Sequence, residues 1–283
     1  MSPPRFRFAQ FEVPWRLGPP DSRYMLRDPR SADGPPSHII VLATLGAPER
    51  RRLSRRSREA TPQPDPTPVA TSRATVIDVG RAADSEDQAR AWLASAGEDE
   101  LGAALTQLNR ALHAFRVITA DPYLHPVGRA QVIVARLGYG LGEQVADGHW
   151  TAARELEARE PRRSRSRILH PQARLAAVLG AREAVLPCED LALRARLDLD
   201  LGRAREAALQ LVVALDAALA ELGAEDTHGL AERLAALRED RDAVGGAAQA
   251  ALTGPLTAAQ TEIVAVTLDR IEAALRARAV ANA

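Results

Sequence analysis

Asp121, Tyr123 and His125 bring a carboxylate, a phenol and an imidazole into one short segment, and they are the residues best placed to do chemistry. Such a group can act as a general base, and with further imidazoles it can bind a metal ion. His149 and His170 lie in later predicted loops and are the candidates to complete the site. A structural interpretation is also open, in which Asp121 ends a helix, Tyr123 packs and His125 caps the next helix.

A basic run is the second candidate site. Its six arginines fall within nine residues: Arg50, Arg51, Arg52, Arg55, Arg56 and Arg58. Clustered guanidinium groups neutralise phosphates, so the run could bind nucleic acid or another polyanion. Against this, no aromatic residues alternate with the arginines to stack on bases, and the whole chain has no net charge. A solvated linker in an arginine-rich sequence explains the run equally well.

Other residue types exclude whole classes of chemistry. The chain has no lysine, so a Schiff-base lysine, a lysine base and a P-loop lysine are all excluded. Cys188 is the only cysteine, which excludes an intrachain disulfide and a cysteine metal cluster. Asp198 and Asp200 resemble a metal-binding pair, but two positions along a helix they point about 200° apart. The motifs therefore predict no cofactor and no metal.

The composition predicts a mostly helical protein in the cytoplasm. Alanine and leucine supply most of the apolar residues, and both are strong helix formers. A single cysteine fits a reducing compartment, and the N-terminus lacks the apolar core of a signal peptide. The most apolar stretch, residues 207–222, contains two acidic residues and a glutamine and is too short to span a bilayer, so no membrane contact is expected.

The elements that must position these residues begin with a sheet. Alternating apolar residues predict strands at 6–15 and 24–27, with a β-bulge near Ala9 that would bring both sets of apolar side chains of the first strand to one face. Residues 39–45 are apolar on both faces and predict a central strand. Residues 74–79 have one polar face and predict an edge strand. The result is a mainly antiparallel sheet of three or four strands.

Helices are expected from Asp84 onward. The predicted helices cover residues 85–95, 98–120, 126–137, 150–158, 171–183, 191–201, 204–222, 230–238 and a last segment that begins at the capping box Thr257-x-x-Gln260. Asp84 and Ser85 are expected to cap the first of these helices. The second is amphipathic, with an apolar stripe of Leu101, Leu105, Leu108, Leu112 and Phe115. Glycines are expected to interrupt helices at 138–142 and at 245–246. The helix–Gly–helix unit at 191–222 is similar to a tetratricopeptide-type hairpin.

These elements predict an α+β fold: a small, mainly antiparallel N-terminal sheet followed by a larger all-helical bundle or α-hairpin domain. The sheet region is expected at 1–82 and the helical domain at 83–283. Between the strands predicted at 39–45 and 74–79, residues 47–72 are too long for a hairpin turn and rich in proline, so we expect a disordered basic insertion there.

Three functions are compatible with these features. The lack of catalytic motifs favours a non-catalytic cytoplasmic protein-interaction or scaffold protein with a protein partner. The first alternative is a nucleic-acid or polyanion binder that uses the run from Arg50 to Arg58. The second is a small-molecule enzyme with its site around Asp121 to His125.

Overall fold

The structure, a computed structural model, describes residues 3–27, 34–46, 69–157, 171–224 and 229–281. The chain forms two compact units, Met1–Arg159 and Glu160–Ala283, and each is described by itself. The expected division between residues 82 and 83 falls inside the first unit, because the segment that follows it adds two strands to the sheet and covers one of its faces.

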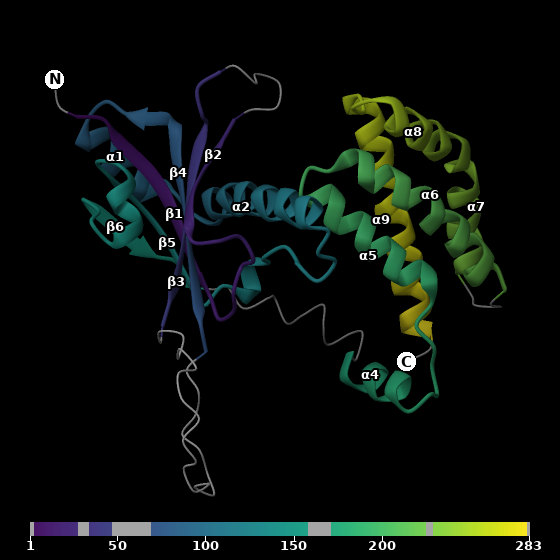
Figure 1. The fold of residues 1–283 in the computed structure, drawn as a ribbon. Helices are drawn as coiled ribbons and strands as arrows, with labels where there is room; N and C mark the ends of the chain where they lie inside the picture. The colour runs from purple at the N-terminus through teal and green to yellow at the C-terminus, as the bar shows by residue number, and fades with distance from the viewer. Residues whose placement is uncertain (1–2, 28–33, 47–68, 158–170, 225–228, 282–283) are drawn as a thin grey trace, which may run out of the picture. The chain divides into compact units, whose positions relative to one another are not determined.

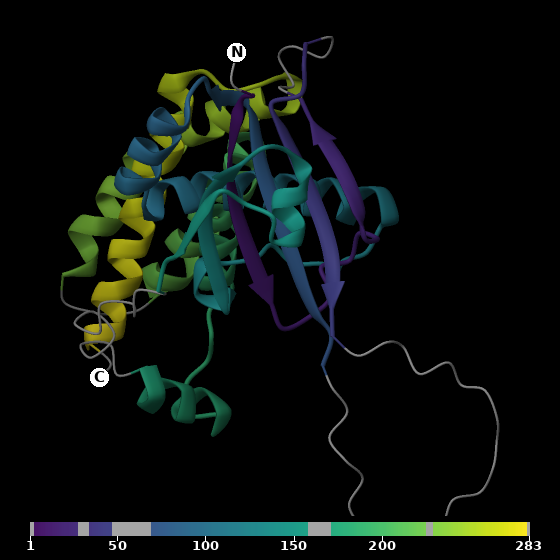
Figure 2. The same cartoon turned by 90° about the vertical axis from the view of Figure 1, so that its left-hand side faces the viewer.

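The first unit is built on a six-stranded antiparallel sheet (Figure 1). Its strands are β1 (Arg5–Val13), β2 (Ser22–Leu26), β3 (His38–Leu45), β4 (Thr71–Ala83), β5 (Val134–Gly140) and β6 (Ala152–Glu155). Figure 2 shows them side by side in the order β2-β3-β4-β1-β5-β6, and every neighbouring pair is antiparallel. The expected antiparallel N-terminal sheet and α+β class are confirmed, but the sheet has more strands than expected.

Two helices, α1 (Glu86–Ser95) and α2 (Glu98–Thr119), cover one face of this sheet. Ser85 caps α1, as predicted: its hydroxyl accepts the backbone N–H of Gln88 at 3.2 Å. The predicted leucine stripe of α2 is buried against the sheet together with one face of β1. The main core of this unit contains Phe11, Val13, Ile40, Leu101, Leu108, Leu112, Leu137 and Tyr139.

The strand β1 lies inside the sheet between β4 and β5, and both of its faces are buried. Its pairing with β4 runs without interruption from Arg7 to Val13, and the register shifts only between Arg5 and Arg7. The bulge expected near Ala9 is therefore wrong. Phe8 packs in a small cluster on the face opposite the helices, whereas Phe11 belongs to the helix-covered core.

The strand β4 is also internal, between β3 and β1, so the expected edge position at 74–79 is wrong. The polar face at Asp78 indicated an edge, but β1 and β3 pair with this strand on its two sides. The hydroxyl of Thr75 accepts a hydrogen bond from the side chain of Gln10 at 3.0 Å, and both residues are buried. β4 already includes Thr71 and Ser72, so the expected insertion at 47–72 overlaps it. Residues 47–68 lie outside the described residues.

Glycines explain why β5 was taken for a helix followed by a turn. Gly138 lies opposite Phe8 in the sheet, and a Cβ there would be 2.6 Å from the Phe8 ring. A Cβ on Gly140 would be 2.4 Å from Cγ1 of Val145. Both glycines thus make room for apolar side chains that pack on the sheet. The helix expected at 126–137 is replaced by a single 3₁₀ turn and β5, and the helix expected at 150–158 by β6.

The second unit is helical. Its helices are α4 (Pro171–Leu179), α5 (Pro187–Asp200), α6 (Ala204–Glu221), α7 (Leu230–Glu239), α8 (Arg241–Thr253) and α9 (Ala258–Ala281). The helices predicted at 171–183, 191–201, 204–222 and 230–238 are confirmed apart from their ends. The predicted capping box of the last helix is also present, because Gln260 accepts the backbone N–H of Thr257 at 2.9 Å and donates its own to the Thr257 hydroxyl at 3.2 Å.

The break expected at 245–246 is wrong, because α8 continues through both glycines. A helical glycine costs about 1 kcal/mol relative to alanine, and burial of Val244, Ala247 and Ala251 on the same helix offsets that cost. One described helix, Ala204–Ala224 with its final turn, is long and apolar enough to cross a membrane. The apolar side chains along one side of this helix lie in the hydrophobic core of the second unit, so its apolar composition is explained by packing within the fold.

Candidate binding sites

The residues predicted to form a polar site lie mostly at the surface. Asp121 follows α2 and accepts the backbone N–H of Tyr123 at 2.9 Å, which fits its interpretation as a helix-ending residue. The Tyr123 side chain is 83% exposed, and His125 and His149 are exposed as well. Neither imidazole makes a hydrogen bond or ion pair to another described residue. His170 lies outside the described residues.

Across the described ranges, no group of three or more His, Cys, Asp or Glu side chains is arranged to hold a metal ion. The structure therefore brings together only Asp121 and the backbone of Tyr123. The basic run from Arg50 to Arg58 lies outside the described residues, so its polyanion binding stays a prediction. Removal of that run would test it, because the affinity for a polyanion should then lose its dependence on salt.

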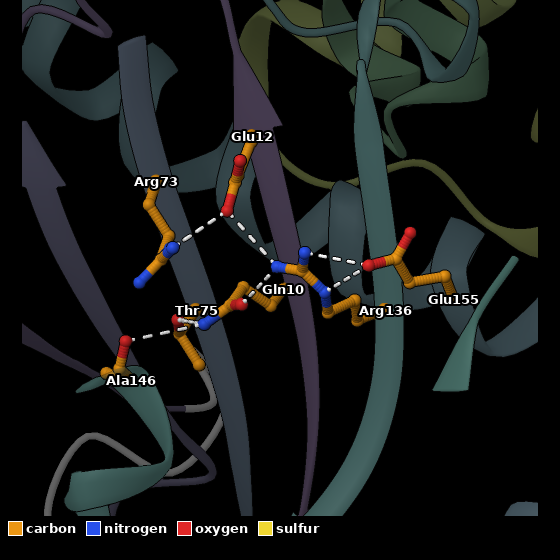
Figure 3. A network of polar contacts seen from close by, with 7 residues as sticks. All are labelled: Gln10, Glu12, Arg73, Thr75, Arg136, Ala146 and Glu155. Carbon is orange, nitrogen blue, oxygen red and sulfur yellow. Dashed lines mark hydrogen bonds and ion pairs between the residues drawn. The ribbon is translucent and has the colours of Figure 1, made fainter. Parts of the chain in front are cut away.

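A polar network crosses the sheet face opposite α1 and α2 (Figure 3). Gln10, fully buried in the middle of β1, donates to Thr75 at 3.0 Å and to the backbone oxygen of Ala146 at 3.4 Å, and accepts from Arg136 at 3.1 Å. Each polar atom of its amide thus has a partner, which removes the cost of burying it. The network links β1, β4 and β5 to the 3₁₀ turn Glu143–Asp147.

Two arginines converge on one carboxylate in this network. Oε1 of Glu12 accepts from Nη2 of Arg73 at 2.9 Å and from Nη1 of Arg136 at 3.1 Å. Arg136 also contacts Glu155 at 2.8 Å, so two arginines are balanced by two glutamates (Figure 3). This network therefore fixes the sheet and offers no free charge for chemistry.

An inner cavity of about 130 Å³ lies between the sheet and the helices α1 and α2. Polar residues from both layers line it: Arg7, His38, Asp78, Arg81, Trp92, Glu100 and Gln107. The guanidinium carbon of Arg7 lies 5.2 Å from the centre of the Trp92 ring, a cation–π contact. Burial lowers the pKa of His38 below its ordinary value, even though the nearby Asp78 carboxylate raises it.

An apolar groove of about 650 Å³ lies within the second unit, among α4, α5 and α9. Its apolar lining is Leu175, Val178, Val185, Ala192, Leu193 and Leu275. Leu175 is 58% exposed and Leu193 is 68% exposed, although leucine is among the residues most often buried. Contiguous exposed apolar surface of this kind marks interaction sites.

Ion pairs fix the charged rim of this groove. Arg174 on α4 contacts Glu183 at 2.7 Å and Glu189 at 2.6 Å, and these carboxylates raise its pKa further. Glu272 on α9 contacts Arg196 at 2.7 Å. The rim therefore carries both signs of charge.

The sequence did not single out the inner cavity or the groove. A signal for the cavity was present in Arg7, a charged residue between Phe6 and Phe8 on a strand with two buried faces. No comparable signal marks the groove, because Leu175 and Leu193 look like ordinary core positions until the helices are packed.

No protein-family model matches the chain, and no curated protein and no solved structure is significantly similar to it.

Proposed function

We propose that this chain is a non-catalytic protein-interaction protein whose second unit binds an amphipathic helix of a partner in the groove among α4, α5 and α9. The observation that carries this proposal is the incomplete burial of the side chains of α4. None of its side chains from residue 172 to residue 179 is fully buried. We place this function in the cytoplasm, which the lone, unpaired thiol of Cys188 supports.

A helix as short as α4 needs a partner surface. It has nine residues, and isolated helices below about 12–15 residues are marginal in water. In the described structure, ion pairs of Arg174 attach it, while Leu175 stays largely exposed. A bound segment that covers Leu175 would supply the burial that α4 lacks, at about 25 cal/mol for each Å² of apolar surface removed from water.

The shape of the groove favours a helix as the occupant. Its walls are helices, whose side chains form ridges that fit the grooves of another helix. The partner helix would place leucine-like side chains at positions i, i+3 or i+4, and i+7 against Leu193 and Leu275. Charged residues of both signs would flank its apolar face, because Arg174 and Glu272 lie at the rim.

Photo-cross-linking in cells tests the proposal directly. Benzoylphenylalanine replaces Leu193 in the groove or, as the matched control, Leu252 on α8, which is 59% exposed and does not line the groove. We expect one dominant adduct from position 193 alone, with the cross-linked peptide in an amphipathic helix of another protein. An adduct with a second copy of this chain, or identical patterns from both positions, would contradict the proposal.

Substitution then measures the contribution of the groove. In the purified complex, Leu193→Arg should weaken binding of the cross-linked partner by about tenfold or more, because a charge would enter the apolar interface. Leu252→Arg should leave the affinity unchanged. Circular dichroism of both variants shows that the helices persist. Equal affinity of the two variants would place the binding surface elsewhere.

A further inference from the structure

Arg7 has an unsatisfied donor inside the inner cavity of the first unit. Its Nε atom is buried and has no hydrogen-bond partner among the described residues. Within the described ranges, the guanidinium of Arg7 makes a cation–π contact with the ring of Trp92. Buried charged donors without acceptors are rare and costly in folded proteins, so each one calls for an explanation.

A second arginine on the same strand repeats this pattern. Nε and Nη1 of Arg5 are buried without a hydrogen-bond partner in the described part of the chain, although Nη2 contacts Glu86 at 3.3 Å. Arg5 and Arg7 thus have three buried nitrogen atoms near α1 without a hydrogen-bond acceptor among the described residues. The nearest acidic residues of the cavity are engaged elsewhere: Asp78 contacts Arg81 at 3.3 Å, and Glu100 accepts the backbone N–H of Gly97 at 2.6 Å.

We propose that the inner cavity binds a small monocarboxylate whose oxygens accept hydrogen bonds from Arg7. The planar guanidinium matches a carboxylate with two parallel hydrogen bonds, and the ring of Trp92 holds it in orientation. This site is separate from the groove of the second unit and does not depend on the function proposed for that groove.

The cavity limits the size of the ligand. Its volume of about 130 Å³ is close to that of a cavity which accepts benzene, about 150 Å³. Apolar atoms of Ala9, Val76, Ala103 and Leu137 form part of the wall, so the rest of the ligand is a short aliphatic chain or one small ring. The cavity opens to solvent on one side, so this limit applies to the part of the ligand that it encloses.

The cavity also limits the charge of the ligand. Arg7, Arg81, Asp78 and Glu100 all line it, and Arg81 is paired with Asp78 at 3.3 Å. The charge that faces a ligand beside Arg7 is therefore that of Glu100, and like charges repel a second negative charge on the ligand. A dicarboxylate or a phosphate dianion therefore binds more weakly than a monocarboxylate of similar size. This charge preference separates a monocarboxylate site from a general anion site.

Calorimetry and NMR on the full chain test the proposal with butyrate, benzoate and inorganic phosphate as probes. We expect a dissociation constant of about 1 mM or tighter for one of the two carboxylates, as the small number of ligand atoms allows. The indole N–H signal of Trp92, assigned through Trp92→Phe, should shift on binding. Phosphate should bind at least about tenfold more weakly.

Two arginine variants complete the test. Arg7→Met keeps the length of the side chain, removes the unpaired charge and should weaken carboxylate binding by about tenfold or more. Arg23→Met is the control, because Arg23 is an exposed residue on β2 that pairs with Glu143. It should leave binding unchanged. Carboxylate binding that survives in Arg7→Met, its absence in the parent chain, or phosphate binding of equal strength would each overturn the proposal.

Discussion

The side-chain amide of Asn109 forms two hydrogen bonds with the backbone of Val127. Nδ2 of Asn109 donates to the carbonyl oxygen at 2.9 Å, and Oδ1 accepts the N–H at 2.7 Å. Asn109 is 4% exposed and lies among the leucines on the buried face of α2. It therefore attaches the segment between α2 and β5 to the helix that supports the sheet.

Replacement of Asn109 by leucine should destabilise the first unit by about 2–4 kcal/mol, because two buried backbone groups of Val127 would lose their partners. Urea unfolding monitored by tryptophan fluorescence gives the free energy. Thr106→Ala, at a half-buried position of the same helix, should change it by less than about 0.5 kcal/mol. A loss from Asn109→Leu no greater than from Thr106→Ala would show that the contact adds nothing to stability.

Acidification should destabilise the first unit through His38. Burial lowers the pKa of His38 from its ordinary value of 6.5; Asp78 raises it, and Arg81 and Arg110 lower it further. Just below pH 6.5, His38 binds a proton in the unfolded chain but stays neutral in the folded chain. The free energy of unfolding must therefore fall as the pH drops from 6.5 towards the lower folded-state pKa.

The variant His38→Gln removes this proton uptake. Unfolding free energies measured on both sides of pH 6.5 should depend less on pH in the variant than in the parent chain. Equal pH dependence in the two proteins would mean that His38 titrates alike in the folded and unfolded states.

Asp198 should be essential to the hairpin of α5 and α6. It is 6% exposed, accepts Nε–H of Arg203 at 2.8 Å and accepts from Gln210 at 3.1 Å. Asp198→Ala should cost about 3–5 kcal/mol, because the charge of Arg203 would stay half-buried without a partner. In the double variant Asp198→Ala, Arg203→Met that charge is absent and part of the stability should return. Strictly additive losses would contradict this coupling.

The thiol of Cys188 should be unreactive in the folded protein. Burial, followed by the neighbouring Glu221 carboxylate, raises the pKa of this thiol to about 12. Iodoacetamide should therefore modify it only when the second unit opens, even at about pH 8, where ordinary thiols react. The modification rate should rise in Asp198→Ala and stay unchanged in Asn109→Leu. Rapid labelling of the parent chain would show that Cys188 is accessible in the native state.

The parts of the fold that were predictable share a local origin. The caps at Ser85 and Thr257 and the leucine stripe of α2 follow from residues within a few positions of one another, and the structure has all three. The hairpin of α5 and α6 is marked locally by Gly202, which has a φ of +73°. Such signals need no knowledge of distant chain segments.

The wrong predictions concern residues whose contacts lie far away in the sequence. Gly138 looked like a helix-ending residue because only Phe8, far away in the sequence, shows that it makes room on the sheet. Residues 74–79 looked like an edge strand because their two neighbours in the sheet, β1 and β3, come from other parts of the chain. The inner cavity likewise forms only when Arg7 on β1 meets Trp92 on α1. Sequence spacing alone could not predict that contact.

The central position of β1 constrains how the protein is made. This strand is the first of the described strands to leave the ribosome, yet one of its two neighbours, β5, ends at Gly140. The backbone groups of β1 that face β5 stay unpaired while the chain between β1 and β5 is synthesised, at about 5–20 residues per second. A nascent first unit therefore exposes an apolar strand for several seconds, and chaperone binding at β1 during translation would protect it from pairing with other chains.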